Sequence, residues 1–243
     1  MASAPLVLVV QHAEPETMGL VEPLCRELGI AWHLCRPYAG EAIPPATQPY
    51  DGLVVLGGPM NVDETDRYPF LTDEVKLLQQ AFRRDLPALG ICLGAQLMAK
   101  AAGSKVTKGP GPEVGWFPIR LTEAGRQDPF FAGLPDELMS FHWHEDTCAL
   151  PAKAIHLASS AQYPQQAFRL GPAALALQCH FEVTPEIVER WASETSSHDP
   201  APLRAGLAQY GEPVAQTGRT ILTRFLQTVV AWHDAREEAH APR

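Results

Sequence analysis

Short apolar runs alternate with longer helix-like segments in the first part of this chain, and this alternation limits the possible folds more than any other feature. Residues 6–10, 30–35, 52–56 and 88–91 form the apolar runs, and apolar residues recur at helical spacing over residues 70–82. Such alternation is typical of a sheet of mainly parallel strands with helices on both faces. The pattern therefore predicts an α/β fold with an open, mainly parallel central sheet.

The pattern changes after Gly103, where helix-like segments become scarce. Strand-like runs at residues 114–121, 138–144, 155–159, 167–170 and 174–179 predict a smaller antiparallel sheet. Thr184-Pro185-Glu186 is an N-cap signature, which predicts a helix through Trp191. A last helix is expected over residues 217–233. With no internal repeat and no obvious linker, residues 1–243 are expected to form one domain.

Composition excludes several classes of partner. The chain has 243 residues, a formal net charge of −9 and 46% hydrophobic residues, so it lacks the basic character that nucleic-acid binding requires. The apolar run near the N-terminus is too short for a signal peptide or a membrane span, which predicts a cytoplasmic protein. Five cysteines without a C-x-x-C pair indicate neither a disulfide framework nor a cysteine zinc site.

The stretch GICLGAQ places Cys92 between Gly90 and Gly94, where an expected strand gives way to an expected helix. A nucleophile at such a sharp turn needs small neighbours, because a Cβ would collide with nearby main chain. The helix dipole would also favour a negatively charged sulfur, and the Leu93 amide would be free to bind an oxyanion. The motif alone fits a buried cysteine at a tight corner equally well.

A possible base lies in the segment QCHFE, where another apolar strand is expected to end. Side chains two apart on an extended segment point the same way, so Glu182 can orient the imidazole of His180. Taken alone, the pair would be better explained as a capped strand end. Because Cys92 and His180 both follow strands, at the edge where open α/β sheets build their sites, a catalytic pair is favoured.

The third piece is Gly57-Gly58-Pro59-Met60, which also follows an apolar strand directly. Paired glycines allow the backbone to approach a ligand and turn its N–H groups toward a negative charge. The same residues are common in ordinary turns. This segment is therefore a candidate oxyanion loop.

Together these three stretches resemble the class I (triad) glutamine amidotransferases, and most of all the stand-alone proteins similar to the amidotransferase domain of GMP synthase. The resemblance runs from the first strand to about Trp191. It implies a flavodoxin-like fold and hydrolysis of the glutamine side-chain amide through a thioester, with no cofactor and no metal. It also implies roles for named residues: Cys92, His180 and Glu182 as the catalytic triad, Gly58 and Leu93 as oxyanion donors, and Met60 and Gln96 as substrate contacts.

Two departures from the family pattern affect the expected site. Phe181 stands where the family has proline, but the spacing of His180 and Glu182 is intact. The segment SFHWHEDTC is similar to the family's S-H-G-D stretch, with Glu145 in place of glycine. This resemblance implies substrate contacts at His142, Trp143 and His144.

Two further features of the sequence carry weaker expectations. A metal interpretation of the His142-x-His144 pair is disfavoured, because no third ligand stands at a suggestive spacing. The stretch Glu113-Val114-Gly115-Trp116 resembles a segment near the substrate pocket of the same family. It could equally begin a β-hairpin, with the tryptophan as core packing.

Several functions are compatible with these motifs. The chain has no P-loop or other nucleotide-binding signature, so a synthetase that receives the ammonia would be a separate chain. The same triad could instead hydrolyse γ-glutamyl amides or peptides, or the fold could serve as a binding or regulatory module without turnover. A protein of the DJ-1 or PfpI type shares the elbow but offers no role for His180 and Glu182.

Overall fold

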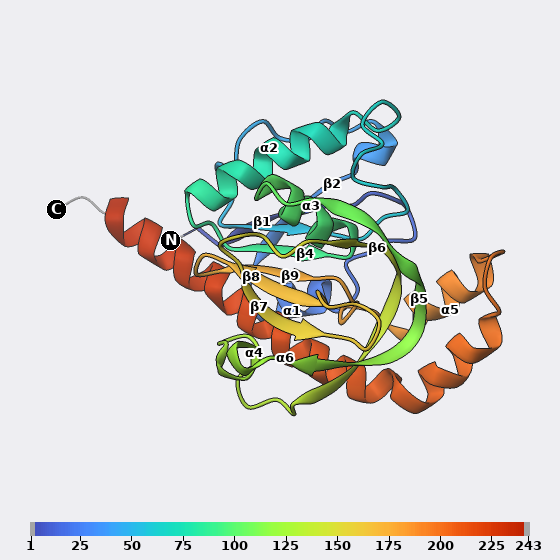
Figure 1. The fold of residues 1–243 in the computed structure, drawn as a ribbon. Coiled ribbons are helices and arrows are strands. Elements are labelled where there is room, and N and C mark those ends of the chain that lie inside the picture. The colour runs from blue at the N-terminus through green and yellow to red at the C-terminus, as the bar shows by residue number, and fades with distance from the viewer. Residues whose placement is uncertain (1–2, 241–243) are drawn as a thin grey trace.

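One mixed sheet runs through the centre of the computed structural model, which describes residues 3–240 (Figure 1). In that part of the chain the sheet has nine strands in the order β2-β1-β3-β4-β9-β8-β7-β5-β6. The strands are β1 (Leu6–Val10), β2 (Ala31–Cys35), β3 (Gly52–Val55), β4 (Ala88–Ile91), β5 (Val106–Leu121), β6 (Glu137–Cys148), β7 (Ile155–Ser159), β8 (Ala167–Leu170) and β9 (Ala174–Leu177). The α-helices are α1 (Val21–Glu27), α2 (Phe70–Arg83), α3 (Leu93–Ala101), α4 (Glu123–Gln127), α5 (Pro185–Glu194) and α6 (Pro200–His240).

The strands from β2 to β9 in this order pair in parallel, and helices cover both faces of this half. Val7 and Val9 of β1 face the core that includes α1 and α6, whereas Leu8 and Val10 face the core that includes α2 and α3. A strand buried on both faces needs apolar residues at every position. This is why the short apolar runs predicted the parallel strands well, and the expected α/β class is confirmed.

The antiparallel strands extend the same sheet, so the separate smaller sheet expected from the sequence is not formed. Strand β9 pairs in parallel with β4 on one edge and antiparallel with β8 on the other. Strands β7, β5 and β6 then continue the antiparallel order. The physical reason is that the backbone N–H and C=O groups on both edges of β9 need hydrogen-bond partners. One edge pairs with the parallel strands and the other with the antiparallel strands, so a single sheet forms.

Strands β5 and β6 form a longer ribbon than expected, with bounds that extend beyond residues 114–121 and 138–144. The early part of β5 holds two prolines and two glycines, which favoured a loop in the sequence. Its register against β6 shifts between Lys108 and Glu113. Such an irregularity admits residues that a regular ladder excludes.

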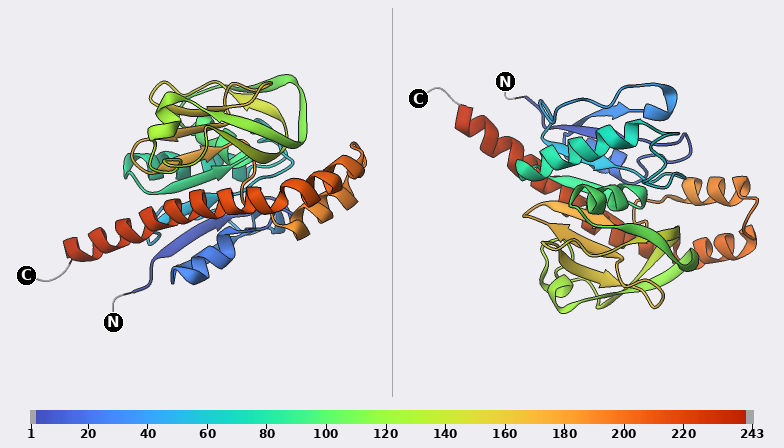
Figure 2. Two further views of the ribbon diagram at one scale, coloured as in Figure 1. Left: turned by 90° about the horizontal axis from the view of Figure 1, so that it is seen from below. Right: turned by 45° about the horizontal axis from the view of Figure 1, so that its top comes forward.

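Helix α6 begins well before residue 217 and includes Pro213 in its interior. It runs along the length of the sheet (Figure 2). Its first half is held by packing: Leu203 and Val214 are buried, and Gly206 lies so close to Trp116 that a Cβ there would approach the indole to 2.0 Å. Tertiary packing thus outweighs the loss of one backbone hydrogen bond at proline.

The expected start of α5 is confirmed, since Thr184 caps the helix through its side chain and Pro185 opens it. None of the described helices, α6 included, is long and apolar enough to cross a membrane.

Candidate active site

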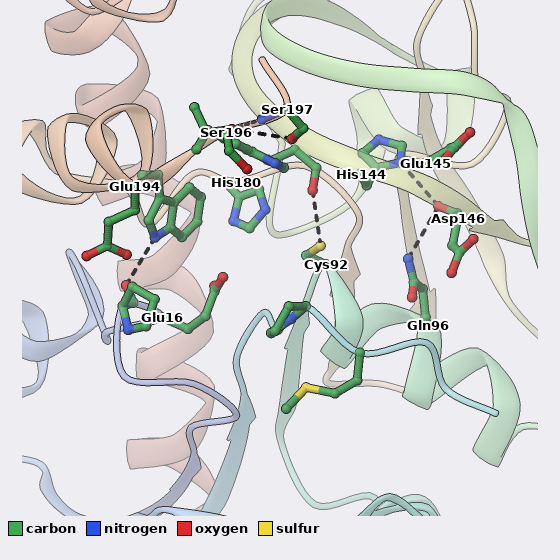
Figure 3. A pocket seen from close by; sticks show the side chains of 17 residues that line it. Glu16, Cys92, Gln96, His144, Glu145, Asp146, His180, Glu194, Ser196 and Ser197 are labelled. Carbon is green, nitrogen blue, oxygen red and sulfur yellow. Dashed lines mark hydrogen bonds between the residues drawn. The ribbon is translucent and has the colours of Figure 1, made fainter. Parts of the chain in front are cut away.

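A pocket of about 560 Å³ opens at the carboxyl edge of the parallel strands (Figure 3). Loops that follow β1, β3 and β9, together with the start of α3, bring residues to this one place, as expected for an open α/β sheet. The residues that line it are Pro15, Glu16, Gly58, Pro59, Met60, Cys92, Gln96, Trp143, His144, Glu145, Asp146, His180, Trp191, Glu194, Thr195, Ser196 and Ser197.

Cys92 occupies a strained turn between β4 and α3. Its φ of 53° and ψ of −107° lie in a region that non-glycine residues rarely adopt. A Cβ on Gly90 would lie 2.6 Å from the backbone of Gly94, and a Cβ on Gly94 would lie 2.0 Å from the carbonyl oxygen of Val55. Both glycines are therefore required for the chain to turn here and present the sulfur to the pocket.

We expect Gly94→Ala to lower the free energy of unfolding by about 3 kcal/mol, because the new methyl group would meet backbone that cannot move aside. Urea unfolding would measure the loss. Gly111→Ala is the matched control, since a Cβ there has no heavy atom nearer than 3.8 Å, and a change below about 0.5 kcal/mol is expected. Equal effects of the two substitutions would contradict the steric requirement at the elbow.

His180 and Glu182 form a buried pair, of which His180 lines the pocket. Nδ1 of His180 donates a hydrogen bond of 2.6 Å to Oε1 of Glu182, and the backbone of His180 is fixed by an antiparallel bridge to Phe141. The imidazole also packs edge-on against Trp191 at 5.1 Å between ring centroids. Within the described part of the chain, Nε2 of His180 has no hydrogen-bond partner, which leaves this atom available for chemistry.

The environment of His180 raises the pKa of its imidazole well above the ordinary value. Burial lowers this pKa, but the charge of Glu182 and the interaction with Cys92 more than offset that effect. Phe181 points the other way, into the core that α1 and α6 share, and is fully buried. Phenylalanine at this position therefore serves packing, and the alternation of the extended segment keeps His180 and Glu182 together.

The Gly57-Gly58 turn is held against the start of α3. A Cβ on Gly58 would lie 2.8 Å from both His12 Cβ and Leu93 Cδ2, so glycine permits this close approach. Leu93 is the first residue of α3, and the N–H of such a residue has no partner within its helix. The amides of Gly58 and Leu93 thus come from two backbone segments packed beside Cys92.

A buried pair that the sequence did not indicate fixes this turn from behind. Nδ1 of His12 lies 2.9 Å from the carbonyl oxygen of Gly57, and Nε2 lies 2.8 Å from Oε2 of Glu74. Both partners are acceptors, so an imidazolium satisfies both contacts. The pKa of His12 is raised accordingly: burial lowers it, and the charge and hydrogen bond of Glu74 outweigh burial.

Of the expected substrate contacts, Met60, Gln96, Trp143 and His144 line the pocket. The Gln96 side-chain amide is oriented by hydrogen bonds to the carbonyl oxygen of Asp146 at 3.3 Å and to Oε1 of Gln178 at 3.2 Å. The Cys92 thiol faces the carbonyl oxygen of Trp143 at 3.8 Å (Figure 3).

His142 is the exception among these contacts, because the structure does not bring it to the pocket. It is fully buried beside Glu113, with Nδ1 2.9 Å from Oε2 of that carboxylate. Its Nε2 lies 2.7 Å from the Ser140 hydroxyl, so both ring nitrogens face groups inside the wall, and His142 is not among the residues that line the pocket. The expectation that His142 contacts the substrate is therefore corrected.

The wall of the pocket also holds acidic residues to which the motifs gave no role. Glu16 extends from the loop after β1 toward His180, and Glu145, Asp146 and Glu194 lie around the opening (Figure 3). Among the described residues that line the pocket there is no lysine or arginine. The position of Glu16 just after a predicted strand was the only signal in the sequence that could have singled it out.

Burial raises the pKa of the Glu16 carboxyl from 4.5 to about 7, partly offset by the charge of His180. A carboxyl whose pKa is raised in the folded state stabilises the fold fully below pH 4.5, and this contribution is lost as the pH rises through 7. Glu16→Gln cannot ionise, so its stability does not fall in this way as the pH rises. Because water screens this half-buried group, we expect the variant to gain about 1 kcal/mol over wild type at pH 8.

Urea unfolding at pH 4.5 and pH 8 would measure this difference. Glu14→Gln in the same loop is the control, because Glu14 is exposed and its pKa is lowered by Arg190. A gain for Glu16→Gln that is equal at both pH values would show that the carboxyl does not titrate in this range.

The structure also supplies the third residue that a metal interpretation of His142 and His144 lacked. Glu113, on the neighbouring strand β5, lies with both histidines in a group whose candidate ligand atoms are all within 4.8 Å of one another. Its distance along the chain from His142 concealed it, and only the pairing of β5 with β6 brings it close.

Comparisons with known proteins place these motifs in a family. Residues 24–190 match the family model "Glutamine amidotransferase class-I". The glutamine amidotransferase-like protein YfeJ of Salmonella typhimurium is 38% identical over 183 residues, which cover 74% of this chain and 77% of that protein. A glutamine-hydrolyzing GMP synthase subunit of Sulfolobus acidocaldarius is 32% identical over 114 residues, which cover 46% of this chain and 56% of that relative.

Solved structures agree with the sequence relatives. A glutamine amidotransferase of Thermotoga maritima is similar with a TM-score of 0.83 and 31% identity, over 93% of this chain and 99% of that one. A glutamine amidotransferase from Methylobacillus flagellatus has a TM-score of 0.84 and 26% identity, over 93% and 96% of the two chains. These findings confirm the resemblance expected from the three sequence stretches, and the chain belongs to the class-I glutamine amidotransferase family.

Proposed function

We propose that this chain hydrolyses the side-chain amide of glutamine through a γ-glutamyl thioester on Cys92, releasing ammonia and glutamate. The observation that carries the proposal is the shared pocket: Cys92 stands in a strained turn, and the His180 imidazole, oriented by Glu182, lines the same cavity. A nucleophile, a base and a group that orients the base are the parts that covalent acyl transfer needs.

The first half of the reaction forms the thioester. Nε2 of His180 takes the proton of the Cys92 thiol, and the resulting thiolate attacks the amide carbonyl carbon. The amides of Gly58 and Leu93 stabilise the oxyanion that develops. As the carbon–nitrogen bond breaks, His180 gives its proton to the departing ammonia. The raised pKa of His180 keeps this proton available at neutral pH.

The second half releases glutamate. His180, now neutral, takes a proton from a water molecule, which attacks the thioester carbonyl within reach of the same oxyanion donors. The carbon–sulfur bond breaks, glutamate leaves, and the sulfur and imidazole return to their initial state. This sequence balances with the chain's own residues and needs no cofactor.

The size of the pocket favours a second candidate, hydrolysis of γ-glutamyl amides or peptides by the same residues. A volume of about 560 Å³ falls within the range of about 300–1,000 Å³ that holds drug-sized ligands. A leaving group larger than ammonia could extend toward Glu194 and Ser197 at the opening. Neither half-reaction depends on the identity of the leaving amine.

Relatives of this chain are subunits of GMP synthase, so a separate synthetase chain that receives the ammonia belongs to the proposal. Steady-state release of glutamate and ammonia from glutamine and from a panel of γ-glutamyl dipeptides would test the function. We expect turnover of at least one of these substrates, with asparagine as a poor substrate. No glutamate from any of them, with or without cell extract, would favour a binding module without turnover.

A further inference from the structure

Two histidines and one carboxylate converge beneath the wall of the pocket. Residues 113 and 144 are paired across β5 and β6, and His142 lies two residues from His144 on the same face of β6. Oε2 of Glu113 lies 2.9 Å from Nδ1 of His142 and 3.0 Å from Nε2 of His144. All three side chains are at most 3% exposed.

The far side of each imidazole is already occupied. Nδ1 of His144 lies 3.1 Å from the carbonyl oxygen of Asp146, and Nε2 of His142 lies 2.7 Å from the Ser140 hydroxyl. A carbonyl oxygen only accepts, so His144 donates from Nδ1, while its Nε2 is hydrogen-bonded to Oε2 of Glu113 at 3.0 Å. A metal ion at this place takes over from the Nε2 proton, and Nε2 then offers its lone pair to the ion. Metal-binding histidines usually donate their outer N–H to a carbonyl or hydroxyl in this way.

The inner nitrogen of His142 has no hydrogen-bond partner among the described residues, although Glu113 is only 2.9 Å away. The contact lacks hydrogen-bond geometry, so an N–H or lone pair on Nδ1 does not point at the carboxylate oxygen. Two ligand atoms that each lie about 2.0–2.2 Å from the same ion are about 3 Å apart. The lone pair of each ligand atom then points at the ion and not at the other ligand atom. The unpaired nitrogen therefore has the orientation of a ligand.

The carboxylate of Glu113 is held in place from a third segment, the connection between β7 and β8. Ser160 donates to its Oε1 at 2.7 Å, and the Gln166 side-chain amide donates to its Oε2 at 2.6 Å. A carboxylate that binds metal is commonly fixed by hydrogen bonds of this kind. The three segments thus fix all three donor groups before any ligand binds.

We propose that Glu113, His142 and His144 bind one divalent transition-metal ion of the class that includes Zn²⁺. Two imidazole nitrogens and one carboxylate oxygen suit such ions, whereas Ca²⁺ and Mg²⁺ prefer sets of oxygen ligands. Three protein ligands leave a fourth position for water. The ion joins β5 to β6 next to Trp143, whose carbonyl oxygen faces Cys92, so it supports the pocket wall and takes no part in the amide chemistry.

The test uses the full chain with Cys92→Ala, so that the catalytic thiol cannot bind metal. The protein is equilibrated with Zn²⁺ or with Co²⁺, freed of loose ions by gel filtration, and measured for metal content and for the visible d–d absorption of Co²⁺. We expect about one ion per chain and a Co²⁺ spectrum of low symmetry with nitrogen and oxygen ligands. Turnover is not needed for this readout, so its outcome is independent of the proposed function.

Glu113→Gln in the same background keeps the side-chain size and removes the charged ligand, and we expect it to weaken metal binding by about 100-fold. Glu137→Gln is the matched control, because Glu137 also lies on this ribbon but is exposed and pairs with Arg120. It should bind metal as the Cys92→Ala chain does. If circular dichroism shows that Glu113→Gln does not fold, His142→Gln takes its place.

Two results would overturn the site. One is a Cys92→Ala chain that retains no Zn²⁺ and shows no d–d absorption with Co²⁺. The other is a folded Glu113→Gln or His142→Gln variant that retains as much metal as the Glu137→Gln control, which would place the ion elsewhere on the surface.

Discussion

Replacing Cys92 with alanine is expected to lower the rate of glutamine hydrolysis by about 10⁴-fold or more, because a covalent mechanism loses its nucleophile. The fold should survive, since alanine is smaller than cysteine and the hydrogen bond that is lost, from the sulfur to the carbonyl oxygen of Trp143, is long at 3.8 Å. The strained φ of 53° is retained by the backbone and its flanking glycines. Ammonia release with glutamine in excess would measure the loss.

Cys148→Ala is the matched control for this result. Cys148 is also buried, and burial raises the pKa of its thiol to about 11, which leaves it a poor nucleophile at neutral pH. We expect activity within a few-fold of wild type. If the two variants retained equal activity, the chemistry would not pass through Cys92.

Glu182→Gln is expected to reduce kcat by about 10²- to 10⁴-fold, because glutamine preserves the shape of the pair but removes the charge that orients and stabilises the imidazolium of His180. The hydrogen bond between Glu182 and Nδ1 of His180 is among the shortest contacts in the site, at 2.6 Å. Glu189→Gln, an exposed residue of α5 that pairs with Arg204, is the control and should keep full activity.

The pH profile gives a second readout of the same substitution. The charge of Glu182 raises the pKa of His180, and burial acts in the opposite direction. Without that charge the pKa falls, and His180 loses its proton at lower pH. The alkaline limb of kcat/KM should therefore move to lower pH in Glu182→Gln, and an unmoved limb would mean that it does not report His180.

The strands were predictable because their signal is local. The bounds expected for β1, β4, β7 and β8 are those observed, since short apolar or alternating runs are read within one window of sequence. The ribbon of β5 and β6 and the start of α6 were mispredicted. In both, contacts between distant segments decide the structure against the local preference of proline and glycine.

The residues of the candidate site also fall into those that local sequence predicted and those that it did not. Cys92, His180 and Gly58 each lie in a short segment at the end of a strand, so three local motifs could be assembled once the sheet topology was assumed. His12 reaches Glu74 across 62 residues, and Glu113 reaches His144 across 31. No spacing rule links such pairs, and only the folded chain reveals them.

The three substrate contacts expected on SFHWHEDTC differ in outcome. Trp143 and His144 line the pocket, whereas His142 is held inside the wall by Ser140 and Glu113. The period of two does not predict this, because His144 shares the face of His142 and still lines the pocket; the partner on β5 decides it.

The central claim is that a γ-glutamyl group is transferred to Cys92. Acid quenching of the enzyme during glutamine turnover, followed by peptide mass spectrometry, tests this most directly. We predict a γ-glutamyl adduct on the peptide that contains Cys92, absent from the Cys92→Ala chain and removed by hydroxylamine, which cleaves thioesters. Turnover of glutamine with no adduct at Cys92, even under rapid quenching, or an adduct on another cysteine, would contradict the account.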